Sequence, residues 1–226
     1  MAMAGRIRMN MARRLMPIDA KLLTLTQWLS PSYPVGAFAW SHGVERAIRD
    51  NWIDDAAALE DWLRACLTEG SGRADAIWLR MAYAGTADAV EAEARAFAAS
   101  AERLKEATRQ GAAFARTTNA VWGLNLPNYV LPVAVGRAAG EVGLELEATV
   151  LLYLQSFLSN LVSAAQRLMP IGQTDAQRVL AALQSDIVSV ARETRGLTND
   201  DIYSNAFLSD IAAMRHETLE PRLFQS

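Results

Sequence analysis

The stretch between Glu147 and Arg167 carries no formal charge, and it constrains the fold more than any other segment. Its apolar side chains form two neighbouring stripes at helical spacing: Val150, Leu154, Phe157, Leu161 and Leu168 in one, and Leu151, Leu158, Val162 and Ala165 in the other. A helix that is apolar over most of its circumference is normally buried, either in a core or in a membrane. A polar band runs beside the stripes, and in lipid each of its groups would need a partner: Gln155, Ser156, Ser159, Asn160, Ser163 and Gln166. The sequence therefore predicts a central core helix over about residues 145–168.

Composition narrows the class of protein. The chain has 226 residues, of which 51% are apolar, and a net charge of −3. This balance is typical of a soluble globular protein and argues against a basic nucleic-acid-binding surface. Cys66 is the sole cysteine, so no internal disulfide is possible, and we expect a reducing, cytoplasmic compartment. Residues 1–18 contain arginines but no apolar signal core, and we interpret them as a disordered leader.

Helical periodicity recurs along the chain, and no stretch alternates apolar and polar residues over the length of a strand. We therefore predict an all-α fold, a single-domain bundle of about ten helices, with the helical core spanning residues 19–195. Within it we expect one helix over Gly36–Asp50, a helix capped by Asp54, a helix with Pro132 in its first turn, and one helix over Asp175–Thr194, capped by Thr174 or Asp175 after a turn at Gly172.

Residues 196–226 differ from the rest of the chain. A polar link leads into a short amphipathic helix that begins with Leu208, Ile211, Ala212 and Met214. The tail beyond it ends in two large apolar side chains, Leu223 and Phe224. One interpretation is that both pack onto their own domain. The interpretation we adopt is a tail that stays mobile until a partner supplies a groove. Deleting Pro221–Ser226 would then leave helicity and the melting temperature nearly unchanged.

The sequence lacks the groups that several enzyme and metal sites require. No GxxxxGK[ST] motif is present, which excludes a Walker-type nucleotide site. The segment HETLE (residues 216–220) has Glu220 where a zinc protease needs its second histidine. With only His42, His216 and Cys66 as nitrogen or sulfur ligands, we expect no four-ligand metal site within one chain. One alternative stays open, a weak site in which His42 or His216 meets its counterpart across a symmetric dimer.

The segment SHGVE (residues 41–45) contains a serine, a histidine and a glutamate but does not predict a hydrolase. Adjacent helical residues diverge, so Ser41 and His42 cannot form the required hydrogen bond on a helix. His42 and Glu45, three residues apart, can meet as a helix pair. Trp40 precedes this segment, where an exposed aromatic side chain suits an interface. From the residues alone we predict a protein that is not an enzyme, has no cofactor and recruits partners.

Four ordered blocks of the sequence resemble a known family. They are SPSYPVGAF (residues 30–38) with SHGVE; Tyr129 with Pro132, Ala134 and Gly136; RLMPIGQTDAQ (residues 167–177); and MRHET (residues 214–218) with RLFQS (residues 222–226). Together they are similar to the urease accessory protein family UreF and cover nearly the whole chain. Two positions depart from the family pattern. Ala39-Trp40 stands where the family usually has Ser followed by Tyr or His, and Gln225 replaces a commonly basic residue.

The resemblance implies a urease maturation chaperone. Proteins of this family are all-helical homodimers that bind the accessory protein UreD (also called UreH) and the GTPase UreG. The assembly docks on apo-urease and assists GTP-dependent nickel insertion, and the family is proposed either to regulate the GTPase or to gate metal transfer. The net charge and the polar band of the core helix predict no binding to nucleic acid or membrane.

The matching blocks supply the residues that we expect to contact partners. They are Gly36, Phe38, Trp40, Ser41, His42, Glu45, Arg167, Gln173, Gln177, Arg215, His216, Arg222, Leu223 and Phe224. A further hypothesis is that Gln155, Ser159, Ser163 and Gln166 line a wet passage that a hydrated ion can use. The alternative of another class is a helical enzyme or ligand-binding module with its pocket against the core helix.

Overall fold

Helices supply the regular structure of residues 20–226, the part of the chain that the computed structural model describes. The predicted leader, residues 1–18, lies outside these described residues. The α-helices are α1 (Ala20–Trp28), α2 (Val44–Arg49), α3 (Ala56–Thr68), α4 (Ser71–Met81), α5 (Ala87–Ala96), α6 (Ala101–Trp122), α7 (Leu131–Glu141), α8 (Leu146–Leu168), α9 (Gln173–Ala182), α10 (Gln184–Glu193) and α11 (Phe207–His216). Short helical segments lie at η1 (Ala37–Ala39), η2 (Ala82–Thr86) and η3 (Asn199–Asp201). The all-α, single-domain prediction is confirmed, and no strand occurs in the described residues.

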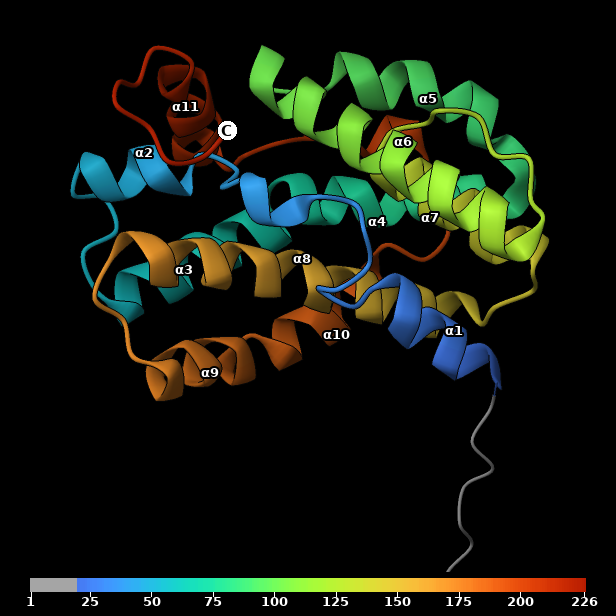
Figure 1. Ribbon diagram of the computed structural model, residues 1–226, viewed down its shortest axis with the longest axis horizontal. Helices are drawn as coiled ribbons and strands as arrows, with labels where there is room; N and C mark the ends of the chain where they lie inside the picture. The colour runs from blue at the N-terminus through green and yellow to red at the C-terminus, as the bar shows by residue number, and fades with distance from the viewer. Residues whose placement is uncertain (1–19) are drawn as a thin grey trace, which may run out of the picture.

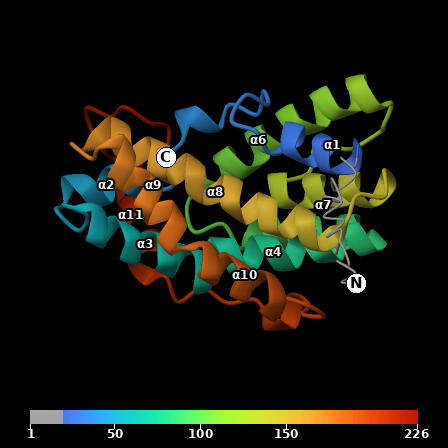
Figure 2. The same ribbon diagram turned by 90° about the horizontal axis from the view of Figure 1, so that it is seen from below.

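Helix α8 is the central element, as its uncharged sequence predicts. It crosses the molecule lengthwise, with α10 on one side and α1 on the other (Figure 2), and packs against α1, α2, α3, α4, α7, α9 and α10. Val150, Leu154 and Leu158 on it have no exposed surface. By length and composition α8 is also the one described helix that can cross a membrane, but a core helix passes the same test. Its seven helical neighbours identify it as a core helix.

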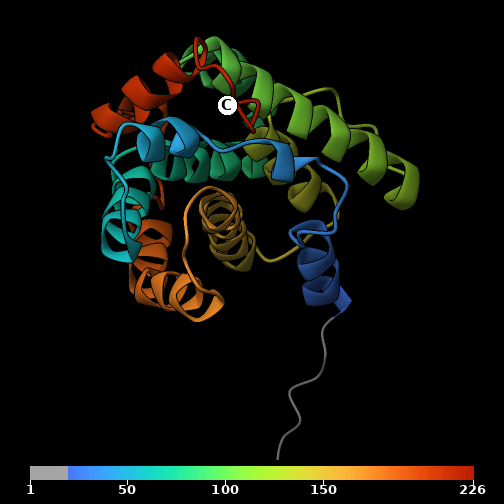
Figure 3. The same ribbon diagram turned by 60° about the vertical axis from the view of Figure 1, so that its left-hand side comes forward.

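A second contact centre lies where α7 packs against α4 and α6. Glycines allow this close approach, because a Cβ built on Gly136 would lie 2.2 Å from the Leu79 carbonyl oxygen of α4. A Cβ on Gly111 of α6 would lie 2.0 Å from the Tyr129 carbonyl oxygen. Pro132 falls in the first turn of α7, as predicted, where its missing N–H leaves no helical bond unmade. Figures 1 and 3 show α4, α6 and α7 lying together on one side of α8.

Several predicted helix boundaries were wrong, for local reasons. Gly36–Asp50 is not one helix, because Gly36, His42 and Gly43 adopt positive φ (74°, 56° and 82°) and separate η1 from α2. Asp55, not Asp54, caps α3 by accepting from the Ala58 N–H at 2.7 Å.

The region predicted as one helix over Asp175–Thr194 is two helices, α9 and α10, with Leu183 fully buried at their junction. Gly172 precedes α9 with φ −71°, a conformation open to any residue, and no side chain caps this helix. The prediction that Thr174 or Asp175 caps this helix was wrong, because α9 begins at Gln173 and both residues lie within its first turn.

Helix α11 joins the C-terminal segment to the rest of the domain. It packs against α2 and α6, and the chain beyond it folds back over α2 (Figure 1). Gly43 allows the contact with α2, because a Cβ there would lie 3.0 Å from the Ala213 backbone nitrogen. This packing brings residues near position 45, near position 104 and after position 216 into one place.

Candidate functional site

The candidate site is built on the turn between η1 and α2. Because His42 and Gly43 adopt left-handed conformations, this turn points its polar groups into the protein instead of along a helix. Ser41, His42 and Glu45 are all buried, at 0%, 4% and 1% exposure. Buried polar groups need hydrogen-bond partners, and the C-terminal segment supplies most of them here.

The last residues of the chain are held by side chains of this turn and of α6. The Glu45 carboxylate accepts the backbone N–H groups of Leu223 and Phe224, both at 2.8 Å. Ser41 donates its N–H to the Ser226 carbonyl oxygen at 3.0 Å, and its hydroxyl donates to the same atom. The Ser226 hydroxyl donates to Glu106 at 2.8 Å. We call Ser41, Glu45, Glu102 and Glu106 the tail seat.

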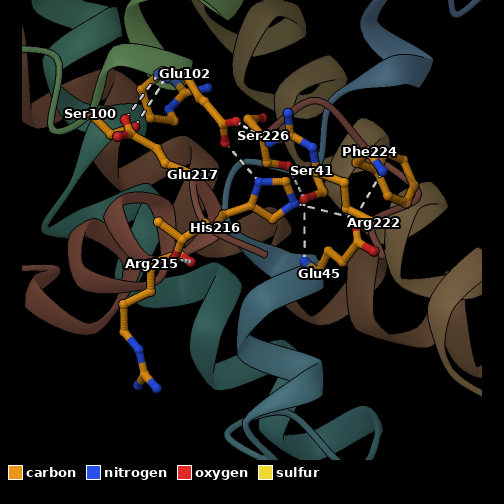
Figure 4. A network of polar contacts seen from close by, with 12 residues as sticks. Ser41, Glu45, Ser100, Glu102, Arg215, His216, Glu217, Arg222, Phe224 and Ser226 are labelled. Carbon is orange, nitrogen blue, oxygen red and sulfur yellow. Dashed lines mark hydrogen bonds and ion pairs between the residues drawn. The ribbon is translucent and has the colours of Figure 1, made fainter. Parts of the chain in front are cut away.

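His216 occupies the centre of the tail seat and has no exposed surface (Figure 4). Its Nδ1 lies 2.7 Å from a Glu102 oxygen, and its Nε2 lies 3.2 Å from a Glu45 oxygen. Arg222 pairs with the second oxygen of Glu102. Glu45 comes from α2, Glu102 from the first turn of α6 and His216 from the last turn of α11, so one imidazole joins three helices.

Arg167 of α8 closes the outer edge of the tail seat. Its guanidinium lies 4.4 Å from the centre of the Phe224 ring, a cation–π arrangement, and it donates to the Phe38 carbonyl oxygen at 2.7 Å. Phe224 is buried beneath it, whereas Phe38 is 76% exposed. The RLMPIGQ block and the RLFQS block, which are remote in sequence, therefore meet at this ion–aromatic contact.

His42 has surroundings unlike those of His216. Its Nε2 lies 2.7 Å from the Ser71 hydroxyl oxygen, and its ring packs edge-on against Phe157. Burial, together with the nearby positive charge of Arg103, holds the pKa of His42 well below its usual value. The predicted pairing of His42 with Glu45 is wrong, because the turn at His42 directs its ring toward α4, and Glu45 pairs with His216.

A cavity of about 130 Å³ lies beside this turn, between α4, α6 and α8. Asp75 and Tyr153 line it, with the tyrosine hydroxyl donating to the Asp75 carboxylate at 2.6 Å. Burial raises the pKa of Asp75 to about 6, against the lowering effect of the tyrosine bond. Trp28 and Trp78 also line the cavity, and their indole N–H groups have no hydrogen-bond partner.

Comparison with known proteins identifies the family. The sequence model of the UreF family matches residues 53–184. The urease accessory protein UreF of Roseobacter denitrificans is 48% identical over 218 residues, which cover 95% of this chain and 98% of that protein. The UreF of Cereibacter sphaeroides (strain ATCC 17025) is 49% identical over 206 residues, with 91% and 98% covered. The UreF of Ruegeria pomeroyi is 41% identical over 214 residues, with 93% and 99% covered. The chain belongs to the UreF family.

Membership in the UreF family agrees with the resemblance carried by the four sequence blocks. The chain is thus a urease accessory protein rather than an enzyme, with a role in urease maturation. The family model ends before residue 185, so it does not include α11 or the tail. The relative from Roseobacter denitrificans extends beyond the part that the family model matches, because it covers 95% of the chain.

The predicted partner-contact residues of this UreF member fall into two groups. The exposed or half-exposed group consists of Gly36, Phe38, Arg167, Gln173, Gln177, Arg215, Arg222 and Leu223. The buried group consists of Trp40, Ser41, His42, Glu45, His216 and Phe224. The buried group cannot touch a partner in this conformation, and the expectation that Trp40 is exposed was wrong, since its side chain is 4% exposed. Gln173 and Gln177 on α9 lie on the opposite side of α8 from α11 (Figures 1 and 3).

The expectation of a mobile tail is also contradicted. Phe224 is 2% exposed and Ser226 is 0% exposed, so this end of the chain packs into the domain. The physical reason is that Glu45 and Ser41 offer acceptors and donors to backbone groups, which an apolar-pattern argument does not detect. Deleting Pro221–Ser226 would leave the buried carboxylates of Glu45 and Glu106 without these partners, so we now expect a lower melting temperature.

The residues described by the structure hold no group of three or more His, Cys, Asp or Glu side chains that fits a metal ion. A site shared across a dimer through His42 or His216 is not supported either, because both rings are buried and bonded to neighbours in their own chain. Cys66 is likewise buried, and burial raises the pKa of its thiol to about 11.

Sequence reasoning missed two parts of the site. Glu102, Arg103 and Glu106 on α6 were not singled out, because acidic and basic residues on a helix are most often solvated. The short amphipathic helix was predicted without saying which face packs inward, and in the structure Phe207, Leu208, Ile211 and Met214 are 65%, 56%, 42% and 53% exposed. Ser209, Ala212, Ala213 and His216 form the inner face instead. The spacing of Phe207, Ile211 and Met214 could have identified the outer stripe.

Proposed function

We propose that this chain is the urease maturation chaperone that, with UreD (UreH) and the GTPase UreG, docks on apo-urease and assists GTP-dependent nickel insertion. Family membership supports the general role, and the outward apolar face of α11 supports the recruitment of a protein partner. A contiguous group of exposed apolar side chains, Phe207, Leu208, Ile211 and Met214, is the kind of surface that a partner buries. The absence of a Walker motif is consistent with leaving GTP hydrolysis to UreG.

The α11 face is the surface we assign to UreD. Arg222 and Leu223 of the tail, which follows α11 in the chain, are exposed as well, and we include them in this surface. In this proposal the buried residues of the tail seat do not touch the partner. They hold α11 and the tail in the arrangement that the partner binds, which removes ordering entropy from the binding step.

Substitution on the α11 face tests this assignment. Leu208→Asp places a charge in the proposed interface and should weaken co-purification with UreD at least about tenfold, because a central apolar contact contributes more than 1 kcal/mol. The matched control is Val188→Asp on α10, since Val188 is 54% exposed and Leu208 is 56% exposed. Both variants should melt close to the wild-type temperature. Equal capture of UreD by wild type and Leu208→Asp would contradict the assignment.

We also propose that the chain acts in the cytoplasm as a homodimer. A strip of α8 between α1 and α9 is only half-buried and includes Leu151, Leu152, Gln155 and Ser159. This strip, on a helix otherwise packed on its remaining sides, supports self-association. Sedimentation equilibrium tests it, and a mass equal to one chain at micromolar concentration would rule it out. Whether the dimer regulates UreG or gates metal transfer is addressed by GTPase assays with and without the chain.

A second candidate function is a helical ligand-binding module whose pocket lies against the core helix. The observation that favours it is the cavity lined by Tyr153, Ser156 and Phe157 of α8, with unpartnered donors on Trp28 and Trp78. The hypothesis of a wet passage concerns a different place, because none of its four residues lines this cavity, whereas Ser159 and Ser163 line a second pocket next to Arg167. Ordered water molecules in a crystal structure would favour the passage, and a bound organic molecule would favour the module.

A further inference from the structure

His216 is bonded to a carboxylate at each ring nitrogen. Nδ1 faces Glu102 at 2.7 Å and Nε2 faces Glu45 at 3.2 Å. A neutral imidazole carries one N–H and one lone pair, so it can donate to only one of two carboxylates. The other carboxylate would then face a lone pair. Glu45 accepts two backbone N–H groups and Glu102 pairs with Arg222, which favours the ionised form of both. With both ionised, only the imidazolium form, with a hydrogen on each nitrogen, makes both contacts favourable.

The charges around His216 come from every element that packs against it. Glu45 comes from α2, Glu102 from α6 and Arg222 from the tail, where it pairs with Glu102. Arg49 of α2 lies 3.9 Å from the other oxygen of Glu45, at the exposed margin. Farther along α6, Glu106 is paired with Arg103. The neighbouring Glu217 accepts from the Ala101 N–H at 2.7 Å and does not meet the ring. Without a charge on His216, the buried carboxylate of Glu45 and the partly buried carboxylate of Glu102 share the close positive charge of Arg222 and the more distant charge of Arg49.

We propose that His216 is a positioning residue that acts as an imidazolium, so that the seating of α11 and the tail depends on one bound proton. This inference rests on the proposed function, because the element that His216 holds in place is the α11 face assigned to the partner. Loss of the proton removes the bond to one carboxylate and leaves that carboxylate buried. Glu45 then binds the Leu223 and Phe224 N–H groups less firmly, because its own position depends on His216.

Ring-nitrogen NMR of the full chain, labelled at histidine, tests the proposal directly. The chain has only two histidines, and a His42→Gln variant assigns their signals. While the tail is seated we expect a proton on each ring nitrogen of His216, because both face a carboxylate, whereas burial and Arg103 favour the neutral form of His42. As the pH rises and His216 loses its proton, amide exchange at Leu223 and Phe224 should accelerate at least about tenfold beyond its intrinsic pH dependence.

Two carboxylate variants distinguish the direct contact of His216 with its two carboxylates from a general effect of nearby negative charge. Glu102→Gln removes one of the two carboxylates that face the ring, so His216 should lose its proton at a lower pH than in the wild type. Glu217→Gln, which removes a neighbouring carboxylate that does not bond the ring, should move it much less. A neutral His216 with protected tail amides would overturn the proposal. So would equal shifts in the two variants, or a tail that stays protected after His216 has lost its proton.

Partner capture distinguishes this inference from the function on which it rests. If the tail is seated only with protonated His216 and UreD capture falls over the same pH range, both hold. If UreD is not captured at any pH while the NMR results hold, the proposed function fails and the proton-dependent seat remains.

Discussion

Two contact regions of this protein are stabilised by different kinds of interaction. Where α7 packs on α4 and α6, backbones approach through glycine, and the surrounding side chains, such as Val133, Ala134 and Ala138, are fully buried and apolar. Where the tail meets its seat, the contacts are carboxylates, hydroxyls, an imidazole and backbone N–H groups. The first region depends on the close fit of apolar surfaces, whereas the second depends on charge and hydrogen bonding. Disrupting the first region should therefore destabilise the whole domain, independently of pH. Disrupting the second should affect only α11 and the tail, and should depend on protonation.

The largest effect should come from adding one methyl group at the apolar region. In Gly136→Ala the new Cβ would lie 2.2 Å from the Leu79 carbonyl oxygen, so α4 and α7 must separate. We expect a loss of about 3 kcal/mol or more, which lowers the melting temperature by roughly 6–12 °C in a domain of this size. Thermal unfolding followed by circular dichroism measures it. Gly172→Ala is the matched control, because its Cβ meets nothing closer than 3.6 Å and its φ suits alanine.

The same difference between the two regions explains why the sequence predicts one of them and not the other. Apolar spacing identified α8 as the core helix, and a first-turn position for Pro132 located the start of α7, because both signals are local and periodic. The tail seat gave no such signal. Glu102 and Glu106 are separated from Ser226 by more than a hundred residues, and nothing in a helical stretch of charged residues says which carboxylate will be buried.

Local conformation explains other errors of prediction. His42 adopts φ 56°, which is uncommon outside glycine and breaks the helix that the pattern of residues 36–50 indicates. At the tail, the family blocks showed which residues belong together, namely SHGVE, MRHET and RLFQS. They did not show that these residues contact one another instead of a partner.

The second effect concerns the tail seat and should be more local. Glu45→Gln removes the charge that faces His216 and leaves an NH₂ group toward one of the N–H donors of Leu223 and Phe224. We expect a cost of about 2–4 kcal/mol, concentrated in α11 and the tail. Hydrogen exchange should show faster exchange there, with α4 and α7 still protected. Glu93→Gln, on the exposed side of α5, is the control and should change little. Uniform loss of protection in all helices would contradict the separation of the two regions.

The third effect is a gain in stability instead of a loss. It concerns Asp75, a polar residue on α4, one of the helices of the apolar contact region. The pKa of Asp75 is raised from 3.8 to about 6, so folding favours its protonated form. The stabilisation is complete below pH 3.8 and is lost as the pH rises through about 6. Asp75→Asn keeps an acceptor for Tyr153 without the charge and should raise stability at neutral pH by about 1–3 kcal/mol.

Melting temperatures of wild type and Asp75→Asn across this pH range measure the effect. The gain should shrink as the pH falls, and the two curves should meet below about pH 3, where Asp75 is protonated in both folded and unfolded wild type. A constant gain at every pH would assign it to packing and not to the charge. A loss at neutral pH would show that the cavity stabilises the carboxylate.

The smallest effect should come from the outer edge of the tail seat. Arg167→Met removes the cation above the Phe224 ring and the bond to the Phe38 carbonyl oxygen but keeps a long apolar side chain. Because the guanidinium is exposed, we expect about 1 kcal/mol, seen as faster exchange of the Phe224 amide with little change in melting temperature. Arg178→Met on α9, which breaks an exposed pair with Asp175, is the matched control. If Arg167→Met released the tail as fully as Glu45→Gln does, the exposed contact with Arg167 would be as important for holding the tail as the buried carboxylate of Glu45. The idea that the buried carboxylates fix the position of the tail would then be wrong.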